Sequence, residues 1–458
     1  MFGGGIMTVE AEAPAALQER SDVLIIGGGP GGSTAAMMLA EKGYRVTLLE
    51  KARHPRFHIG ESLLPANLPL FERLGVADEI RAIGMQKWGA EFVSPWHAGR
   101  TQIFEFGEAW DKSMPFAYQV RRSEFDEILI RRAGTLGTRV IEGCRVRDVE
   151  FPPDGTAAGQ SVRVAAEHDD GRKESFEARF IIDASGRDTF LGTRLNTKQR
   201  DRKHNSSAMY AHFRNAQRHE DCKRAGNITI YWFEHGWVWF IPLADGTTSI
   251  GTVVWPYYMK SRKTPLREFF LDTIAMCPQL QERLKGADMV SAVEATGNYS
   301  YCCERSYGES FLLIGDAFTF IDPMFSSGVM LAMTTAASAA ETVDVCLREP
   351  ARAASALQHF DALSRQGSKE YAWFIHRITN PTMRDLFMGP RNILRMKEAM
   401  LGLLAGDIFG KTPIWSSLRA FKTLYYIVSF ANLKRSHQAL RRRRFNIRPV
   451  EPDQMTAG

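Results

Sequence analysis

The chain has 458 residues, of which 44% are hydrophobic and 24% charged, and its formal net charge at pH 7 is +6. This composition supplies a large hydrophobic core and excludes a wholly disordered chain. The modest positive charge comes without a nucleic-acid-binding motif, and no uninterrupted apolar run approaches the roughly 20 residues that span a bilayer. We expect a soluble, cytoplasmic protein with neither a nucleic-acid partner nor a membrane span.

Residues 1–20 lack a basic segment followed by an apolar core, so they predict a flexible leader and no secretory signal. The six cysteines are scattered without a C-x-x-C pair, which argues against a disulfide framework or a zinc site. His54 and His58 are four residues apart, but Pro55 between them opposes a shared helix face. No metal site is therefore predicted.

The first strong pattern is an apolar run that leads into a glycine-rich turn. Residues 23–26 are typical of a strand buried on both faces, and the sequence GGGPGGS follows at 27–33. In its G-x-G-x-x-G spacing, Gly27 permits a tight turn, Gly29 lets the backbone approach a pyrophosphate, and Gly32 allows close helix packing. We also expect Ser33, the last residue of this turn, to contact the cofactor.

Helical periodicity follows from Ala35 to Lys42 and ends at Gly43. A second strand at 46–49 ends at Glu50, 21 residues after Gly29, where a carboxylate can accept hydrogen bonds from ribose hydroxyls. The helix N-terminus offers free N–H groups to phosphates. Together these elements predict a nucleotide site in a Rossmann-like α/β domain, but they do not distinguish FAD from NAD.

Three later segments extend this prediction along the chain. Residues 180–187 form a buried strand that ends in a small-residue turn, and residues 311–317 form another, with Asp316 placed to bond a ribityl chain. Residues 227–255 predict a three-stranded meander with turns at 235–236 and 245–246. Strand alternation puts Trp237, Trp239 and Ile241 on one face, which by itself is more typical of core aromatics.

In order and composition, these segments resemble the FAD-dependent aromatic hydroxylase superfamily. The glycine turn, the DASGR turn at 183–187 and the Gly315–Asp316 pair match its motifs. Residues 118–126 resemble its V-x-R-x-x-F-D helix start, which implies that Arg122 lies near the flavin. The resemblance implies FAD as the cofactor.

Within that superfamily, the chain is similar to the flavin-dependent halogenases. The segment WVWFIP matches their W-x-W-x-I-P signature, which implies that Trp237, Trp239 and Pro242 shield the flavin from organic substrates. Residues 57–65 also match, so Glu61 and Ser62 are expected to line the flavin. Lys87 corresponds to the essential lysine of the family. A desolvated lysine has a lowered pKa, and its neutral amine can capture or hold hypohalous acid.

The same resemblance implies a halide site at Ser327 and Gly328, where residues 322–329 open an apolar helix. A helix cap beside the flavin without a halide would look similar. Tryptophan halogenases carry a glutamate two residues before this pair, whereas this chain has Phe325. The chain therefore looks closer to the phenol and pyrrole halogenases, several of which act on groups tethered to carrier proteins.

We expect a discontinuous FAD domain at 21–195 and 296–349, an antiparallel substrate sheet at 196–295, a helical region at 350–440 and a basic tail at 441–458. The helical region could cover the substrate entrance, and the tail's arginines are either a solvated tail or a docking patch. The implied function is chlorination or bromination of an electron-rich phenolic or pyrrolic ring. It requires reduced FAD from a separate flavin reductase, O₂ and chloride or bromide, and Glu91 is a candidate ring base.

Two alternatives stay open from the sequence. One is an FAD-dependent monooxygenase or reductase of the same fold, which would consume NADPH directly and need no halide. The other is a non-catalytic flavoprotein that serves as a binding partner, although the intact Lys87 argues against it. The sequence leaves the substrate's identity and tethering, the regiochemistry, the halide preference and the oligomeric state open.

Overall fold

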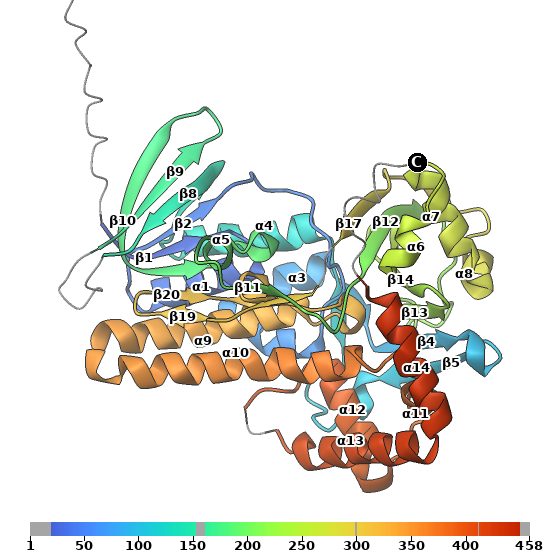
Figure 1. Cartoon of the computed structure of the whole chain (residues 1–458). Helices are drawn as coiled ribbons and strands as arrows, with labels where there is room; N and C mark the ends of the chain where they lie inside the picture. Colours follow the sequence, from blue (N-terminus) through green and yellow to red (C-terminus); the bar gives the residue numbers. More distant parts are fainter. Residues whose placement is uncertain (1–19, 153–160, 298–299, 411, 449–458) are drawn as a thin grey trace, which may run out of the picture.

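A computed structural model describes residues 20–152, 161–297, 300–410 and 412–448 (Figure 1). The predicted leader lies outside the described residues except for residue 20, and so does the end of the predicted tail from residue 449. Two large sheets and a set of C-terminal helices make up the described fold. The mixture of parallel strands, crossover helices and an antiparallel sheet confirms the expected α/β class.

The first sheet carries the nucleotide motifs at the carboxyl ends of its parallel strands. The parts of its central strands that pair in parallel are almost fully buried, because helices pack on one face and strands β8 and β9 pack on the other. β1 pairs in parallel with β2 and with β10, and β10 pairs in parallel with β20. The strands of this sheet are β1 (Ser21–Ile26), β2 (Val46–Glu50), β7 (Arg139–Glu142), β8 (Cys144–Glu150), β9 (Val162–His168), β10 (Lys173–Asp183), β19 (Tyr307–Gly308) and β20 (Phe311–Leu313).

Helices cover this sheet, and Figure 1 shows α9 and α10 running side by side beneath it. α1 is rich in alanine and glycine, so it can approach both the sheet and α9 closely. By length and composition alone, α9 is long and apolar enough to cross a membrane. However, 56% of its apolar 18-residue segment is buried inside the protein. The helices of this region are α1 (Pro30–Glu41), α2 (Leu68–Leu74), α3 (Ala77–Ile83), α4 (Arg122–Thr135), α5 (Phe190–Arg194), α9 (Gly328–Arg348) and α10 (Ala353–Ile375).

The second sheet contains the expected meander and is larger than expected. The sequence places this sheet within residues 196–295, but β4 and β5, from residues 89–105, extend it by parallel pairing of β4 with β13. A strand pairing between segments so distant in sequence leaves no local pattern. The sheet contains β4 (Gly89–Ser94), β5 (Arg100–Glu105), β12 (Ser207–Arg214), β13 (Ile228–Phe233), β14 (Gly236–Pro242), β15 (Thr248–Val254), β16 (Asp288–Met289) and β17 (Glu294–Gly297).

Short elements complete the middle of the chain. Figure 1 shows α6 to α8 beside the second sheet, and α6 contacts the end of α14 (Leu433–Asn446). Two small sheets join the larger units, one of them formed by β3 and β6. These elements are β3 (Met85–Lys87), β6 (Ala117–Gln119), β11 (Lys198–Arg200), β18 (Tyr301–Cys303), β21 (Thr319–Phe320), α6 (Pro256–Lys260), α7 (Leu266–Ala275) and α8 (Pro278–Arg283).

The C-terminal region is helical, but its last part differs from the predicted tail. The helix α14 continues through all four arginines of the expected tail at 441–444, so a boundary at residue 440 divides one helix. Arginine is a good helix former, and Phe445 packs against Tyr257, which ties the end of the helix down. The C-terminal helices after α10 are α11 (Pro381–Met388), α12 (Met396–Ala405), α13 (Ile414–Ala431) and α14 (Leu433–Asn446).

Candidate active site

A cavity of about 520 Å³ lies where the carboxyl ends of the parallel strands face the second sheet. Crevices at this edge of an open α/β sheet are the usual ligand sites of such folds. The cavity brings together segments that lie far apart in the sequence. Its lining includes Gly27, Gly29, Glu50, Glu61, Ser62, Arg122, Trp237, Trp239, Asp316 and Gly328.

The glycine turn has the geometry that its spacing predicts. Gly27 has a φ of +104°, and a Cβ added there would lie 2.4 Å from the carbonyl oxygen of Ala184. A Cβ on Gly32 would lie 1.9 Å from the carbonyl oxygen of Gly27, so only glycine allows α1 to begin this close to β1. Gly32 therefore supports the turn without lining the cavity.

Ser33 does not lie where a cofactor contact would need it. Its hydroxyl is fully buried and donates to the carbonyl oxygen of Gly28 at 3.1 Å, and the residue does not line the cavity. At Gly29, by contrast, the only neighbour of an added Cβ is a guanidinium nitrogen of Arg56, at 3.7 Å. The first turn of α1 has no side-chain cap, so its N–H groups are available to phosphate.

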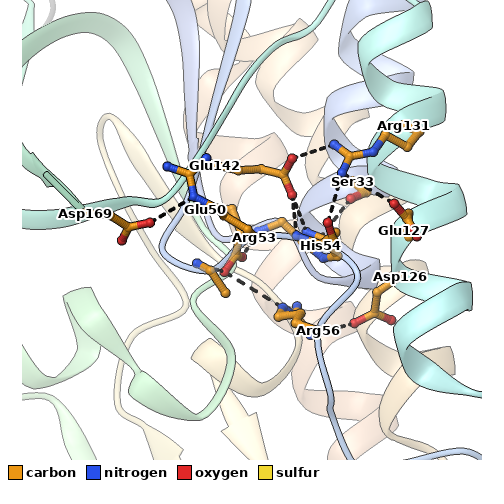
Figure 2. Close-up of polar contacts among 12 residues, drawn as sticks. Ser33, Glu50, Arg53, His54, Arg56, Asp126, Glu127, Arg131, Glu142 and Asp169 are labelled. Carbon is orange, nitrogen blue, oxygen red and sulfur yellow. Dashed lines mark hydrogen bonds and ion pairs between the residues drawn. The ribbon is translucent and has the colours of Figure 1, made fainter.

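Glu50 and Arg56 flank this phosphate region (Figure 2). One oxygen of Glu50 accepts a 2.6 Å hydrogen bond from the backbone N–H of Gly28, and the other accepts from the N–H of Ala52. Arg56 lies between Glu50, at 3.9 Å, and Asp126, at 3.0 Å. Arg56 lines the cavity beside Gly29 and is a candidate phosphate ligand that the sequence did not reveal. Its position just before the 57–65 motif was the available signal.

Arg122 lines the cavity, as the resemblance implied, at the start of α4. Its guanidinium makes two hydrogen bonds to Asp126, at 2.8 and 2.9 Å, and a third to the carbonyl oxygen of Ile59. Although burial opposes ionisation, the guanidinium groups of Arg122 and Arg56 hold the pKa of Asp126 below its usual value. This buried pair therefore keeps both of its charges.

Asp316 provides a test of whether the cavity suits FAD. Its carboxylate lines the cavity and makes no side-chain hydrogen bond within the described residues, and burial raises its pKa to about 6. A polyhydroxyl chain would supply the missing donors. An open glycine turn, a ribose-facing Glu50 and an unpaired Asp316 lie along one cavity, so the residues fit a flavin dinucleotide.

The second sheet forms the opposite wall of the cavity. Trp237, Trp239 and Ile241 line the cavity from one face of β14, which confirms the alternation predicted from the sequence. A Cβ on Gly251 of β15 would lie 2.1 Å from the Trp239 ring, so the glycine makes room for the indole. Pro242 is in β14 but is not part of the cavity lining, because it follows Ile241 and points to the other side.

The predicted halide loop lies at the start of α9. Ser326 has a φ of +56°, and Ser327 precedes the first turn of the helix, which no side chain caps. Gly328 lines the cavity, and an added Cβ there would meet no atom within 4 Å. Ser327 is 2% exposed and does not line the cavity, whereas its neighbours Ser326 and Gly328 do.

Lys87 is at the end of β3, 1% exposed, beside the cavity rather than in its lining. Its Nζ donates to the Ser62 hydroxyl and to the Leu63 carbonyl oxygen, both at 3.0 Å, and lies 5.2 Å from the Phe106 ring centroid. Both hydrogen-bond acceptors are neutral. Burial lowers the pKa of the Lys87 ammonium to about 7. The neutral form of this amine is therefore accessible near physiological pH.

Glu91 is not placed to act as the ring base. It lies on β4 and pairs with His219 and Arg224, at 2.9 and 3.0 Å. Its neighbour Phe92 belongs to the aromatic core, and alternation directs Glu91 to the opposite face of the sheet. The candidate role of Glu91 is therefore wrong.

A buried histidine–carboxylate pair beside the flavin cavity was also not predicted from the sequence. His212 on β12 contacts the carboxylate of Glu61 at 2.9 Å, and both side chains are at most 6% exposed. The sequence singled out Glu61 but contained no sign of a histidine 151 residues later. No group of three or more potential metal ligands occurs in the described parts of the chain.

Comparisons with known proteins identify the family. A model of the FAD binding domain matches residues 20–364. The chain is 32% identical over 410 residues to a 1H-pyrrole-2-carbonyl-(peptidyl-carrier protein) chlorinase of Pseudomonas fluorescens, covering 85% of this chain and 89% of the relative. Among solved structures, it is similar to the myxobacterial chondrochloren halogenase (33% identity, TM-score 0.73), covering 87% of this chain and 93% of that chain.

A flavoprotein/dehydrogenase from Cytophaga hutchinsonii has a closely similar fold. Its TM-score is 0.81 at 27% identity, and the match covers 90% of this chain and all of the other. This chain thus shares its fold with both solved structures. The two halogenase relatives match it at higher sequence identity than the Cytophaga protein does. The chain belongs to the flavin-dependent halogenases and is an oxidoreductase that uses FAD and a halide.

Proposed function

We propose that this halogenase installs chloride or bromide on a phenolic or pyrrolic ring that a carrier protein presents as an acyl group. Support for the tether comes from the chlorinase of Pseudomonas fluorescens, whose name specifies a pyrrole-2-carbonyl group on a peptidyl-carrier protein. The observation that carries the ring class is the apolar environment of Phe325, in the position where tryptophan halogenases hold a glutamate.

Phe325 is 3% exposed and packs among aromatic rings. Its ring centroid lies 6.2 Å from that of Tyr371 and 6.3 Å from that of Phe387, which in turn contacts Phe92 and Phe104. Lys87 contacts Phe106 of the same core cluster. The rings packed around Phe325 supply no carboxylate that could stabilise a cationic ring intermediate. The ring itself must then be electron-rich, as phenols and pyrroles are.

Each part of the site has a role in the proposed mechanism. When bound and reduced, FAD supplies with O₂ the oxidising equivalent that turns a halide into hypohalous acid. The uncapped backbone N–H groups at Ser327 and Gly328 hold the halide at the start of α9. Trp237 and Trp239 form the wall that keeps organic substrate away from the flavin.

Lys87 receives the oxidant next to Ser62, which lines the flavin cavity. The neutral Nζ attacks the halogen of hypohalous acid, and the departing hydroxide takes an amine proton to leave as water. The ring then attacks the halogen on Nζ, the N–halogen bond breaks, and the amine regains a proton as the ring loses one. A hydrogen bond from the Lys87 ammonium to intact hypohalous acid is the other route by which the same residue can direct the halogen.

The reductant is proposed to come from a separate flavin reductase. The chain has one glycine fingerprint, at Gly27, Gly29 and Gly32, and that fingerprint belongs to the FAD cavity. The sequence contains no second phosphate-binding turn of this kind that would mark a nicotinamide dinucleotide site.

The test incubates the protein with FAD, a flavin reductase, NADH and bromide, and detects products by mass spectrometry. The substrates are pyrrole-2-carbonyl and 4-hydroxyphenyl acyl groups on a carrier protein, the corresponding free acids, and tryptophan. We expect bromination of the tethered rings and none of tryptophan. The matched control replaces the lysine (Lys87→Met) and should oxidise reduced flavin without forming product.

Three results would contradict the proposal in different ways. Oxygenated product without bromide would indicate a monooxygenase. Flavin oxidation without any product from the whole panel would indicate a non-catalytic flavoprotein. Bromination of the free acids alone would remove the carrier protein from the proposal while leaving the halogenase intact.

A further inference from the structure

A second cavity, of about 220 Å³, lies between the end of the second sheet and helices α11 and α14. Figure 1 shows α14 beside α11 at this side of the sheet. Its lining is dominated by arginine and tryptophan, and we name it the arginine pocket. The residues that matter below are Trp96, Trp232, Arg384, Arg435, Arg442 and Arg443.

The four guanidinium groups of the arginine pocket differ in their partners. Arg435 pairs with Asp385 and Arg442 with Glu234, and all four of these side chains are well exposed. Within the described residues, Arg384 and Arg443 have no carboxylate within 4 Å. Asp201 and Asp322 act on Arg443, and Asp385 acts on Arg384, only from beyond ion-pair distance. The charges of these two arginines are therefore only weakly compensated.

These two groups are fixed by neutral neighbours. The guanidinium of Arg384 stacks 3.5 Å from the ring centroid of Trp96. Arg443 donates to the Thr379 hydroxyl at 3.2 Å and to the Lys203 carbonyl oxygen at 2.8 Å. Burial lowers the pKa of both Arg384 and Arg443 to about 10.

Unused hydrogen-bond donors accompany this excess charge. The Nε of Arg384 and the Nε1 of Trp232 are buried without an acceptor in the described structure, and both residues line the pocket. A buried donor without an acceptor is unfavourable, and so are neighbouring like charges. Such an arrangement is costly for the free protein and becomes favourable when an oxyanion occupies the pocket.

We propose that the arginine pocket binds a phosphate ester on the tether that carries the substrate. Guanidinium groups match phosphate oxygens with paired hydrogen bonds, and the single charge of a tether's phosphodiester is shared by two oxygens that can accept from two arginines. A phosphate on the tether would anchor it while the acyl ring extends into the protein. This inference rests on the tethered substrate of the proposed function.

The pocket is connected to the active site by two routes. Trp232 on β13 is directly opposite Trp237 on β14, and Trp237 lines the flavin cavity. Arg443 contacts the Nδ1 of His204 at 3.3 Å, and the Nε2 of that ring contacts Asp322 at 2.9 Å. Asp322 begins the halide loop and accepts from the N–H of Met324. An anchored tether would therefore lie next to residues that contact the Trp237 wall of the flavin cavity and the halide loop.

The test measures binding by calorimetry to the full chain saturated with FAD, so that the flavin phosphate region is already filled. The probes are 4′-phosphopantetheine, pantetheine and inorganic phosphate. We expect 4′-phosphopantetheine to bind more tightly than inorganic phosphate and pantetheine not to bind. Arg384→Gln should weaken the binding of 4′-phosphopantetheine about tenfold or more, because it removes a charged donor.

Matched controls come from the same helix. Arg441 and Arg444 flank the pocket arginines on α14, but both are exposed and do not line the pocket. Arg441→Gln and Arg444→Gln should therefore leave affinity within about twofold, because solvent and salt screen exposed charges. If Arg384→Gln fails to fold, Arg442→Gln tests the same pocket from an exposed position.

The outcomes separate the pocket from the proposed function. Equal binding of pantetheine, or unchanged affinity in both Arg384→Gln and Arg442→Gln, would overturn the pocket. Inorganic phosphate that binds as tightly as 4′-phosphopantetheine would assign the site to free phosphate and overturn the tether. Arginine-dependent phosphopantetheine binding in a protein that brominates only free rings would support the pocket and remove the tethered substrate.

Discussion

Two buried cations beside the same cavity have opposite surroundings. Arg122 is 6% exposed and held by two hydrogen bonds to the carboxylate of Asp126. Lys87 is 1% exposed and has only the hydroxyl of Ser62 and a carbonyl oxygen as acceptors. The charge of Arg122 is compensated by a carboxylate. Lys87 has no anionic hydrogen-bond partner among the residues that the structure describes, so its ammonium group loses a proton more readily.

The difference separates two uses of a cation. A guanidinium with a permanent charge and a carboxylate partner suits a fixed contact with a cofactor. An amine whose pKa is about 7 can change its protonation state during a reaction. Burial alone does not distinguish a structural cation from a reactive one, whereas the charge of its hydrogen-bond partners does.

The largest expected effect is the loss of halogenation when the reactive cation is removed. Lys87→Met should lower bromination by about 10³-fold, within the range that a positioned proton-transfer or nucleophilic group supplies. Flavin binding should persist, because Lys87 does not line the flavin cavity. Product formation and FAD affinity are measured together. The exposed Lys112→Met is the matched control, and a Lys87→Met rate near that of the control would refute the role of Lys87.

The next effect concerns the compensated cation. Asp126→Ala leaves Arg122 buried without its partner and should lower the free energy of unfolding by about 3–5 kcal/mol. Urea unfolding of the protein followed by circular dichroism measures this change. Glu124→Ala removes an exposed carboxylate from the first turn of the same helix and should change stability by no more than about 0.5 kcal/mol. Equal effects of the two substitutions would contradict the difference between the cations.

Replacing Lys87 should raise the free energy of unfolding, whereas Asp126→Ala should lower it. Its pKa falls from 10.5 to about 7 in the folded protein, so the unfolded chain binds more protons between these values and wild-type stability rises with pH there. At pH 7, Lys87→Met should therefore be more stable than wild type by up to about 4 kcal/mol. The advantage should shrink towards pH 10.5, where the unfolded lysine also loses its proton. Urea midpoints at pH 7, 8.5 and 10 test this, and a difference independent of pH would exclude a depressed pKa.

The smallest effect adjusts the lysine without removing it. If the neutral amine reacts, the bromination rate should rise with pH and level off above about 7. Ser62→Ala removes one acceptor that favours the ammonium form, so it should move this acid limb to lower pH by a fraction of a pH unit. Rates measured from pH 5.5 to 9 compare the two proteins. A shift to higher pH would show that Ser62 stabilises the neutral amine instead.

Local patterns predicted the cofactor half of the protein well. The turn at Gly27, Gly29 and Gly32, the acid Glu50 and the strands on either side follow from steric and hydrogen-bonding rules that act over a few residues. The tryptophan face of β14 follows from alternation in the same way. These are the features that a short segment determines by itself.

Features that depend on distant partners could not be predicted. The parallel pairing of β4 with β13 joins residues more than 130 positions apart, and the contact of His212 with Glu61 spans 151. Ser33 and Pro242 lie in segments that were placed correctly, but their side chains point away from the cavity. Only the packed structure decides which way a side chain within a known motif faces.

The discontinuous flavin cavity also has a consequence for how the protein is made. Its lining runs from Ile26 to Ala332, and the strands β1, β10 and β20 pair across that same interval. During synthesis the cofactor site cannot close until about the first 330 residues have emerged, and contacts so distant in sequence form slowly. Until then, α1 lacks its packing partner α9. Free flavin should therefore favour late folding steps, and a shortage of it during expression should lower the yield of folded enzyme.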